Sequence, residues 1–188
     1  MAHPIPLPTL AVLKHAAALI LEVHVVRIQE LVVTPGELQM PLDRRIRVIG
    51  HHEQAGSPNN GSHAEEALIY HHQHLLAPPL LLEAQNSPCA DGGDIRQAHT
   101  NHWHDCERLL LAVASHWNSN VQFFADHCYP GSRMYLEWNG LMRQILTLGR
   151  EHGIPVVGGG VHHFDADSFV HPHLTFCPNN TIELRAWM

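Results

Sequence analysis

The stretch S-H-A-E-E-A-L-I, residues 62–69, begins a predicted helix, and N-S-P-C at residues 86–89 ends the apolar run that follows it. Ser62 and Glu65 have the spacing of a capping box, in which the two side chains satisfy backbone groups at the start of a helix. The apolar run is short and bounded by turn residues, which indicates a buried strand. A second helix begins at Cys106. This helix, strand and helix form the unit around which we arrange the rest of the chain.

The flanking segments predict more helices and strands in alternation. Helical patterns occupy residues 9–20, 63–76, 106–117 and 132–152, and strand patterns occupy residues 23–33, 45–51, 80–85, 121–125 and 154–157. We expect the first two strands to form a hairpin and the last two to run parallel, because a long helix connects them. The C-terminal residues 181–188 predict a short helix. The pattern therefore predicts one α/β domain over residues 1–188, with an extended N-terminus at 1–8 and an inserted loop at 90–105.

Composition narrows the classes of function. The formal charge is −7 with only eleven Lys and Arg residues, which disfavours a strong nucleic-acid binder, although nineteen His residues gain charge as the pH falls. Four Cys residues are too few for a disulfide scaffold and favour metal ligation or free thiols. No apolar run approaches the roughly 20 residues that cross a bilayer. With no signal peptide visible, we expect a soluble intracellular protein, cytoplasmic or nuclear, without a membrane partner.

A histidine, a glutamate and two cysteines follow one another in an order that suits metal chemistry. His63 and Glu65 begin one helix, Cys89 ends the predicted strand, and Cys106 begins the next helix. Each residue alone is more often a cap, a surface group or a small buried side chain. Together, H-x-E followed by P-C is the signature of the zinc nucleobase deaminases. We therefore expect His63, Cys89 and Cys106 to bind Zn²⁺, with Glu65 transferring protons.

These motifs resemble the cytidine deaminase superfamily, and N-G-S-H-A-E-E with N-S-P-C looks like its AID/APOBEC branch. The resemblance is strongest over residues 60–125 and extends weakly from 23 to 157. It implies a three-layer cytidine deaminase-like fold, with a five-stranded mixed sheet whose last two strands are parallel, flanked by helices. It also implies a hydrolase that uses zinc to convert cytosine to uracil. The branch edits nucleic acid, so single-stranded DNA or RNA is the expected partner.

The sequence departs from the family at the second cysteine. The family has P-C-x-x-C, whereas Gly92 stands here where that cysteine belongs, and the next one is Cys106. The helical pattern after Cys106 matches the helix that normally begins at this ligand, which predicts an insertion of about 14 residues. Such an insertion costs about 1–2 kcal/mol in loop closure. The competing interpretations are a lost ligand or a replacement among His99, His102, His104 and Asp91.

The resemblance also implies substrate contacts, and here it leaves choices open. Asn59 or Asn60 would contact the sugar or base, and Asn86 and Ser87 stand where the family has Trp-Ser. The family's loop for the base 5′ to the target corresponds to D-H-C-Y-P-G-S-R at 126–133. There Tyr129 would stack on a base, or be an exposed turn aromatic, and Arg133 would meet a phosphate.

Two rivals to polynucleotide deamination stay open. One is a deaminase of free nucleosides or nucleotides, and the other is a catalytically silent protein that binds nucleic acid or a protein partner. The histidine clusters at 71–74, 99–104 and 162–163 either reflect composition or hold a second zinc, with the inserted loop as its expected location. The sequence does not indicate the oligomeric state.

Overall fold

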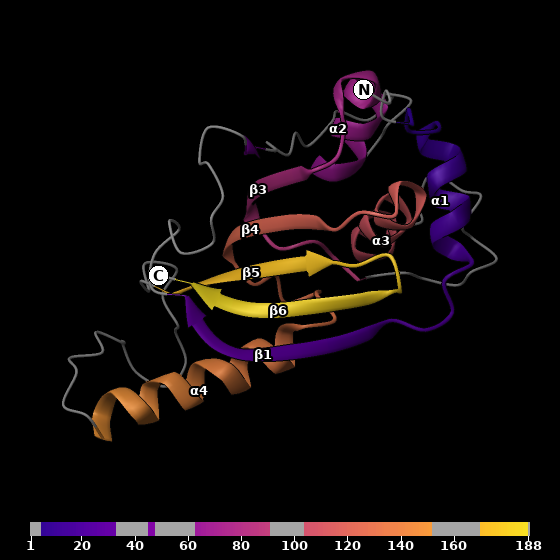
Figure 1. Cartoon of the computed structure of the whole chain (residues 1–188). Coiled ribbons are helices and arrows are strands. Elements are labelled where there is room, and N and C mark those ends of the chain that lie inside the picture. Colours follow the sequence, from indigo (N-terminus) through magenta and orange to yellow (C-terminus); the bar gives the residue numbers. More distant parts are fainter. Residues whose placement is uncertain (1–4, 33–44, 48–62, 91–103, 152–169, 188) are drawn as a thin grey trace.

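The computed structural model describes residues 5–32, 45–47, 63–90, 104–151 and 170–187 (Figure 1). Their elements, in chain order, are α1 (Leu10–Ala18), β1 (His24–Val32), β2 (Ile46–Arg47), α2 (Ala64–His72), the 3₁₀ turn η3 (Gln73–Leu75), β3 (Leu80–Asn86), α3 (Cys106–Trp117), β4 (Val121–His127), α4 (Tyr135–Glu151), β5 (His171–Phe176) and β6 (Thr181–Trp187). The four longer predicted helices are present with boundaries shifted by a few residues. No described helix is long and apolar enough to cross a membrane.

The described strands form one mixed sheet in the order β1-β6-β5-β4-β3-β2. Strands β1 and β6 are parallel, as are β2, β3 and β4, whereas β5 runs antiparallel to both of its neighbours, β4 and β6. The predicted α/β class with a mixed sheet is confirmed. The predicted count of five strands is wrong, because the described part of the chain contributes six.

The predicted hairpin of the first two strands is also wrong. Strand β1 pairs with β6 and β2 pairs with β3, so the two lie at opposite edges of the sheet. Alternation within each segment indicated a strand but carried no information about its partner. In the structure, Val25 is next to Ile182 of β6 and Ile46 is next to Leu82 of β3, so each strand adds an apolar side chain beside another.

The predicted C-terminal helix is in fact strand β6. Ile182, Leu184 and Ala186 are all buried and occupy every second position, which is the period of a strand with one face in the core. Asn180, with a φ of 62°, allows the tight turn that leads from β5 into β6. The local period therefore decides the element more reliably than the helix propensity of the individual residues.

The prediction of parallel last strands is not met by the strands described. Residues 154–157, predicted as the parallel partner of β4, lie outside the described residues. The described neighbour of β4 on that side is β5, which is antiparallel, and the last two strands β5 and β6 are also antiparallel. Helix α4 nevertheless follows β4 in sequence, as predicted.

The core lies between one face of the sheet and the helices. A row of registered neighbours crosses four strands through Leu82, Phe123, Leu174 and Leu184, each with at most 1% of its surface exposed. The described helices add to the same core cluster through side chains that include Leu13, Ile69, Leu110 and Leu141. Figure 1 shows α1, α2 and α3 gathered at one end of the sheet, with α4 apart from them below β1. The second helical layer of the predicted three-layer arrangement stays a prediction.

Candidate metal centre

Three predicted ligands meet where two helices begin. His63 precedes α2, Cys89 follows β3, and Cys106 is the first residue of α3. The Nδ1 atom of His63 lies 3.1 Å from Cys89 Sγ and 3.4 Å from Cys106 Sγ. All three potential ligand atoms lie within 4.8 Å of one another, so this cluster could hold a metal ion.

Backbone hydrogen bonds bring Cys106 back to Cys89 across the predicted insertion. The amide of Glu107 donates to the carbonyl oxygen of Cys89 at 3.0 Å, which joins the first turn of α3 to the end of β3. The amide of Ala90 donates to Gly131 O at 2.9 Å and so fixes the other side of this turn. The helix therefore begins beside Cys89 although the two cysteines are distant in sequence. Cys106, the expected third ligand, therefore lies within ligand distance of His63 and Cys89.

The helix cap next to the cluster differs from the predicted one. The sequence pointed to Ser62 and Glu65, but α2 begins one residue later, with His63 as its N-cap and Glu66 at the third helical position. Glu66 Oε2 accepts a hydrogen bond from the His63 amide at 3.0 Å. Because Glu66 makes the cap, Glu65 is left for another role. Because Glu65 and Glu66 are adjacent, the sequence alone did not show which of them caps the helix.

His104, a candidate replacement for the third ligand, is occupied by another partner. Its Nδ1 atom lies 2.7 Å from Glu66 Oε2, and its ring stacks on the His63 ring at a centroid distance of 4.4 Å. His104 is therefore a neighbour of the cluster and is not among the three grouped ligand atoms. The candidate replacements His99, His102 and Asp91 lie outside the described residues.

The hydrogen bond between the two thiols shifts their pKa values in opposite directions. A hydrogen bond with Cys106 lowers the pKa of Cys89 to about 4, against the opposing effect of burial. The same hydrogen bond, together with burial, raises the pKa of Cys106 well above its usual value. The hydrogen bond to Cys89 also raises the pKa of His63. A cation bound between the sulfurs would compensate the second negative charge and so favour two thiolates.

Glu65 is buried beside these groups, with 6% of its surface exposed. Burial raises the pKa of its carboxyl to about 7, while a hydrogen bond with Cys106 and the charge of His63 act in the opposite direction. The carboxyl thus interacts with the cluster without being one of its three grouped ligands. A buried carboxyl that titrates near neutral pH can both accept and donate a proton.

The predicted substrate residues lie in different environments. Asn86 is exposed, and Ser87 is buried with its Oγ accepting a hydrogen bond from the Tyr129 amide at 2.8 Å. Tyr129 is 40% exposed, and its ring lies over Gly131, where an added Cβ would stand only 2.5 Å from the ring. Tyr129 thus remains accessible on a loop tied to Ser87. Asn59 and Asn60 lie outside the described residues.

Arg133 belongs to a buried ion-pair network that the sequence did not predict. Its guanidinium donates to Glu107 at 2.8 Å and to Asp105 at 3.4 Å, and both carboxylates are almost fully buried. Asp105 also pairs with Arg108 at 2.7 Å and caps α3. The acidic residues on either side of Cys106 were the available signal, because buried carboxylates need a cation. The guanidinium predicted to meet a phosphate is therefore already engaged.

The remaining histidines form no second cluster within the described part of the chain, where His63, Cys89 and Cys106 are the only group with metal-ligand spacing. The histidines at 71–74 lie on α2 and η3, and the predicted clusters at 99–102 and 162–163 fall outside the described residues. All four cysteines are free thiols, which agrees with the expectation from their number.

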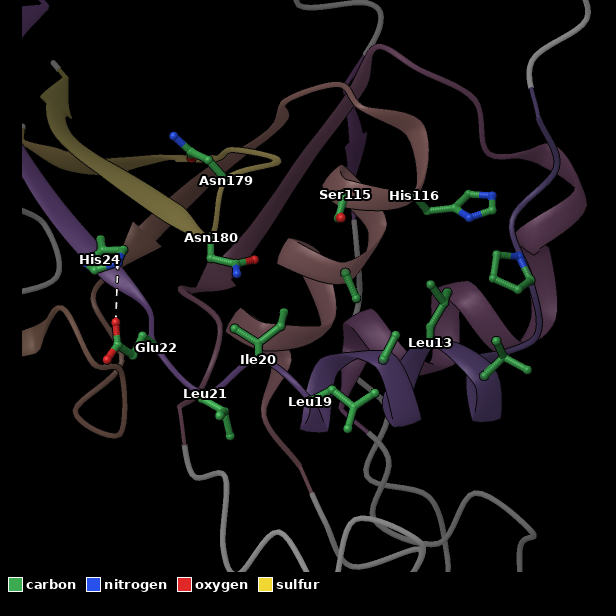
Figure 2. Close-up of a pocket in the computed structure, with 14 residues that line it drawn as sticks. Leu13, Leu19, Ile20, Leu21, Glu22, His24, Ser115, His116, Asn179 and Asn180 are labelled. Atoms are coloured by element: carbon green, nitrogen blue, oxygen red, sulfur yellow. Dashed lines mark ion pairs between the residues drawn. The ribbon is translucent and has the colours of Figure 1, made fainter.

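A pocket of about 710 Å³ lies apart from the metal cluster (Figure 2). It is lined by α1, the segment after it, the last turns of α3 and the turn before β6, with Leu19 and Leu21 exposed at its edge. None of the three candidate ligands lines it. Ala112, its first contact on α3, is six residues beyond Cys106, which corresponds to about 9 Å of helix. The pocket is therefore separate from the candidate metal centre.

Comparison of the chain with protein-family models, with curated proteins and with solved structures finds no match.

Proposed function

We propose that the protein is a zinc-dependent hydrolase that converts cytosine to uracil in single-stranded DNA or RNA. The observation that carries this proposal is the grouping of His63, Cys89 and Cys106 within 4.8 Å, with the buried carboxyl of Glu65 in contact with Cys106. A histidine and two cysteines are the protein ligands of zinc deaminases, and the glutamate two residues after the histidine is their proton carrier.

The donor set fits zinc. Imidazole and thiolate are its preferred ligands, and three protein ligands leave one tetrahedral position open, as catalytic zinc sites require. With Zn–N and Zn–S bonds of 2.0–2.3 Å, tetrahedral geometry places nitrogen and sulfur about 3.6 Å apart. The separations of 3.1 and 3.4 Å around His63 Nδ1 are within about half an ångström of that value. When bound, zinc supplies Lewis-acid activation of a water molecule.

Glu65 would carry the protons of the reaction. It would accept one proton from the attacking water and deliver it to N3 of the cytosine ring, then transfer a second proton to the departing amino group. The C4–O bond forms, the C4–N bond breaks, and ammonia leaves, so that cytosine and water give uracil. Burial of the carboxyl supports this role, since it keeps the pKa of Glu65 near the operating pH.

The form of the substrate has two candidates. The exposed Tyr129 ring, on a loop joined to Ser87 two residues before Cys89, supports stacking with a base of a single strand. The engagement of Arg133 with Glu107 and Asp105 favours a free nucleoside instead, because it removes a cation from phosphate binding. Both candidates use the same zinc and the same Glu65. A silent binding protein would have neither activity.

A metal and product assay on wild type and three variants tests the proposal. Wild type should contain one zinc and release uracil from a cytosine-containing oligonucleotide. Glu65→Gln should keep the zinc and lose about 10²–10⁴-fold in kcat, whereas Cys106→Ala should lose the zinc. Glu137→Gln, at an exposed glutamate of α4, is the matched control and should behave as wild type.

Each rival function gives a distinct result in that assay. Uracil formed only from free cytidine would move the substrate to the second candidate. Zinc without activity on either substrate would indicate the silent binding protein. Retention of zinc by Cys106→Ala would show that the third ligand lies elsewhere in the chain.

A further inference from the structure

Glu66 is a buried carboxylate that holds three groups around His63. Only 2% of its surface is exposed. Oε2 accepts the His63 amide at 3.0 Å and the Nδ1–H of His104 at 2.7 Å, and Oε1 pairs with Lys14 Nζ at 2.8 Å. One side chain of α2 thereby joins α1, the first candidate ligand and the residue two positions before Cys106.

The His104 ring covers one face of the His63 ring. Their centroids are 4.4 Å apart and their planes differ by 12°, which is a stacked arrangement. Because its Nδ1 is fixed by Glu66, the His104 ring cannot rotate about its side-chain bonds without breaking a charge-assisted hydrogen bond. The stack therefore restricts the plane in which the His63 ring can lie.

This restriction matters because one atom of His63 faces both sulfurs. Nδ1 lies 3.1 and 3.4 Å from the two Sγ atoms, so rotation of the ring would move it away from both. A ligand that is already oriented loses less conformational freedom when the metal binds, and groups behind metal-binding histidines typically change metal affinity 10–100-fold.

We propose that Glu66 and His104 are a positioning pair that orients His63 for metal binding, with Lys14 anchoring the pair to α1. This inference rests on the metal site of the proposed function but not on its substrate. Glu66 holds the backbone of His63 and the ring of His104, and His104 holds the plane of the His63 ring. Neither residue supplies one of the three grouped ligand atoms.

Co²⁺ titration distinguishes a positioning residue from a ligand, because absorption of the bound ion reports the donor atoms and the titration gives the affinity. Glu66→Gln and His104→Ala should bind Co²⁺ 10–100-fold more weakly than wild type, with the thiolate absorption of the saturated protein unchanged. Two conservative variants separate the contributions. His104→Asn keeps a donor for Glu66 without the stacked ring, and His104→Phe keeps a ring without the donor, so each should recover part of the affinity.

His72→Ala is the matched control, because His72 is an exposed histidine at the end of α2, and it should bind Co²⁺ as wild type does. Circular dichroism of the metal-free proteins establishes that each variant is folded. Wild-type affinity in both Glu66→Gln and His104→Ala would overturn the inference. A changed donor spectrum in His104→Ala would also overturn it, because His104 would then be a ligand.

The outcome is independent of the reaction. If wild type forms no uracil but the variants bind Co²⁺ more weakly than wild type, the positioning pair is supported and the proposed function is overturned. If wild type forms uracil but the variants bind Co²⁺ as tightly as wild type, the proposed function is supported and the positioning pair is overturned. A wild type that binds no Co²⁺ would overturn both.

Discussion

Glu66 and Glu107 are buried glutamates in the first turns of the two helices that begin at the metal cluster, yet their acidities are shifted in opposite directions. At Glu66 burial raises the pKa, but hydrogen bonds from His104 and Lys14 outweigh it and lower the pKa to about 2. At Glu107 burial dominates and raises the pKa to about 7, although Arg133 and Ser132 oppose it. Position on a helix therefore does not determine the charge of a buried carboxyl.

The difference comes from the number of acids that share the cations. Glu66 has Lys14, His104 and the His63 amide as partners. Glu107 depends on Arg133, whose guanidinium also reaches Asp105, and the negative charge of Asp105 further raises the pKa of Glu107. The charged form of a buried carboxyl is thus stabilised when no other acid shares its cationic partners. The stabilisation is weaker when a second acid pairs with the same cation.

The two networks consequently act on different parts of the site. The network of Glu66 contacts the ring and backbone of a candidate ligand, whereas that of Glu107 joins α3 to the loop that carries Tyr129. We expect substitutions in the first network to change metal affinity and those in the second to change mainly stability.

The largest effect is expected for Arg133→Met. The substitution leaves two buried carboxylates without this guanidinium, and removing one partner of a buried ion pair costs about 3–5 kcal/mol of the free energy of unfolding. Urea unfolding at pH 7 measures the loss, with Arg143→Met, at an exposed arginine of α4, as a control expected to change it by less than about 0.5 kcal/mol. A loss below about 1 kcal/mol would contradict a stabilising role for Arg133.

The dependence of stability on pH should separate the two glutamates. The folded-state pKa of Glu66 is depressed, so its contribution is present above pH 4.5 and is lost as the pH falls from 4.5 through about 2. The folded-state pKa of Glu107 is raised, so the contribution of Glu107 to stability is present below pH 4.5 and is lost as the pH rises from 4.5 through about 7. Each shift corresponds to an upper limit of about 3 kcal/mol over its window.

Glutamine variants assign each window to its residue. We expect Glu66→Gln to reduce the loss of stability in acid, and Glu107→Gln to reduce the loss between pH 4.5 and 7. Unfolding is measured in the presence of a chelator, because metal binding has a pH dependence of its own. If either variant kept the full wild-type dependence in its window, the opposite pKa shifts would be refuted.

The same contrast explains how far the sequence could predict the site. His63, Cys89 and Cys106 were predictable because each stands at a helix start or a strand end that local patterns reveal. The contact of Glu66 with His104 joins residues 38 apart, and that of Arg133 with Glu107 joins residues 26 apart. Local spacing does not identify such partners, because the sequence does not show whether a charged side chain is solvated or buried.

The individual elements of the fold were likewise predictable from local sequence, whereas the pairing of its strands was not. The helices and most strands follow from periods of 3.6 and 2 within short segments. The pairing of β1 with β6 instead joins the two ends of the chain, with His24 opposite Thr181. A hairpin was the simplest local expectation, and only the packing of Val25 and Ile182 in a common core favours the distant partner.

The smallest effect is expected for Ser132→Ala, which tests the weaker partner of Glu107. Ser132 is buried, and its Oγ donates to Glu107 Oε1 at 2.9 Å. Loss of this hydrogen bond should lower the free energy of unfolding by about 1–2 kcal/mol above pH 7, where Glu107 is charged. The loss should be smaller at pH 5, because protonated Glu107 gains less from the serine. Ser115→Ala, at an exposed serine of α3, should change the stability by less than about 0.5 kcal/mol at both pH values. An equal loss at both pH values for Ser132→Ala would mean that the serine stabilises the turn and not the charge of Glu107.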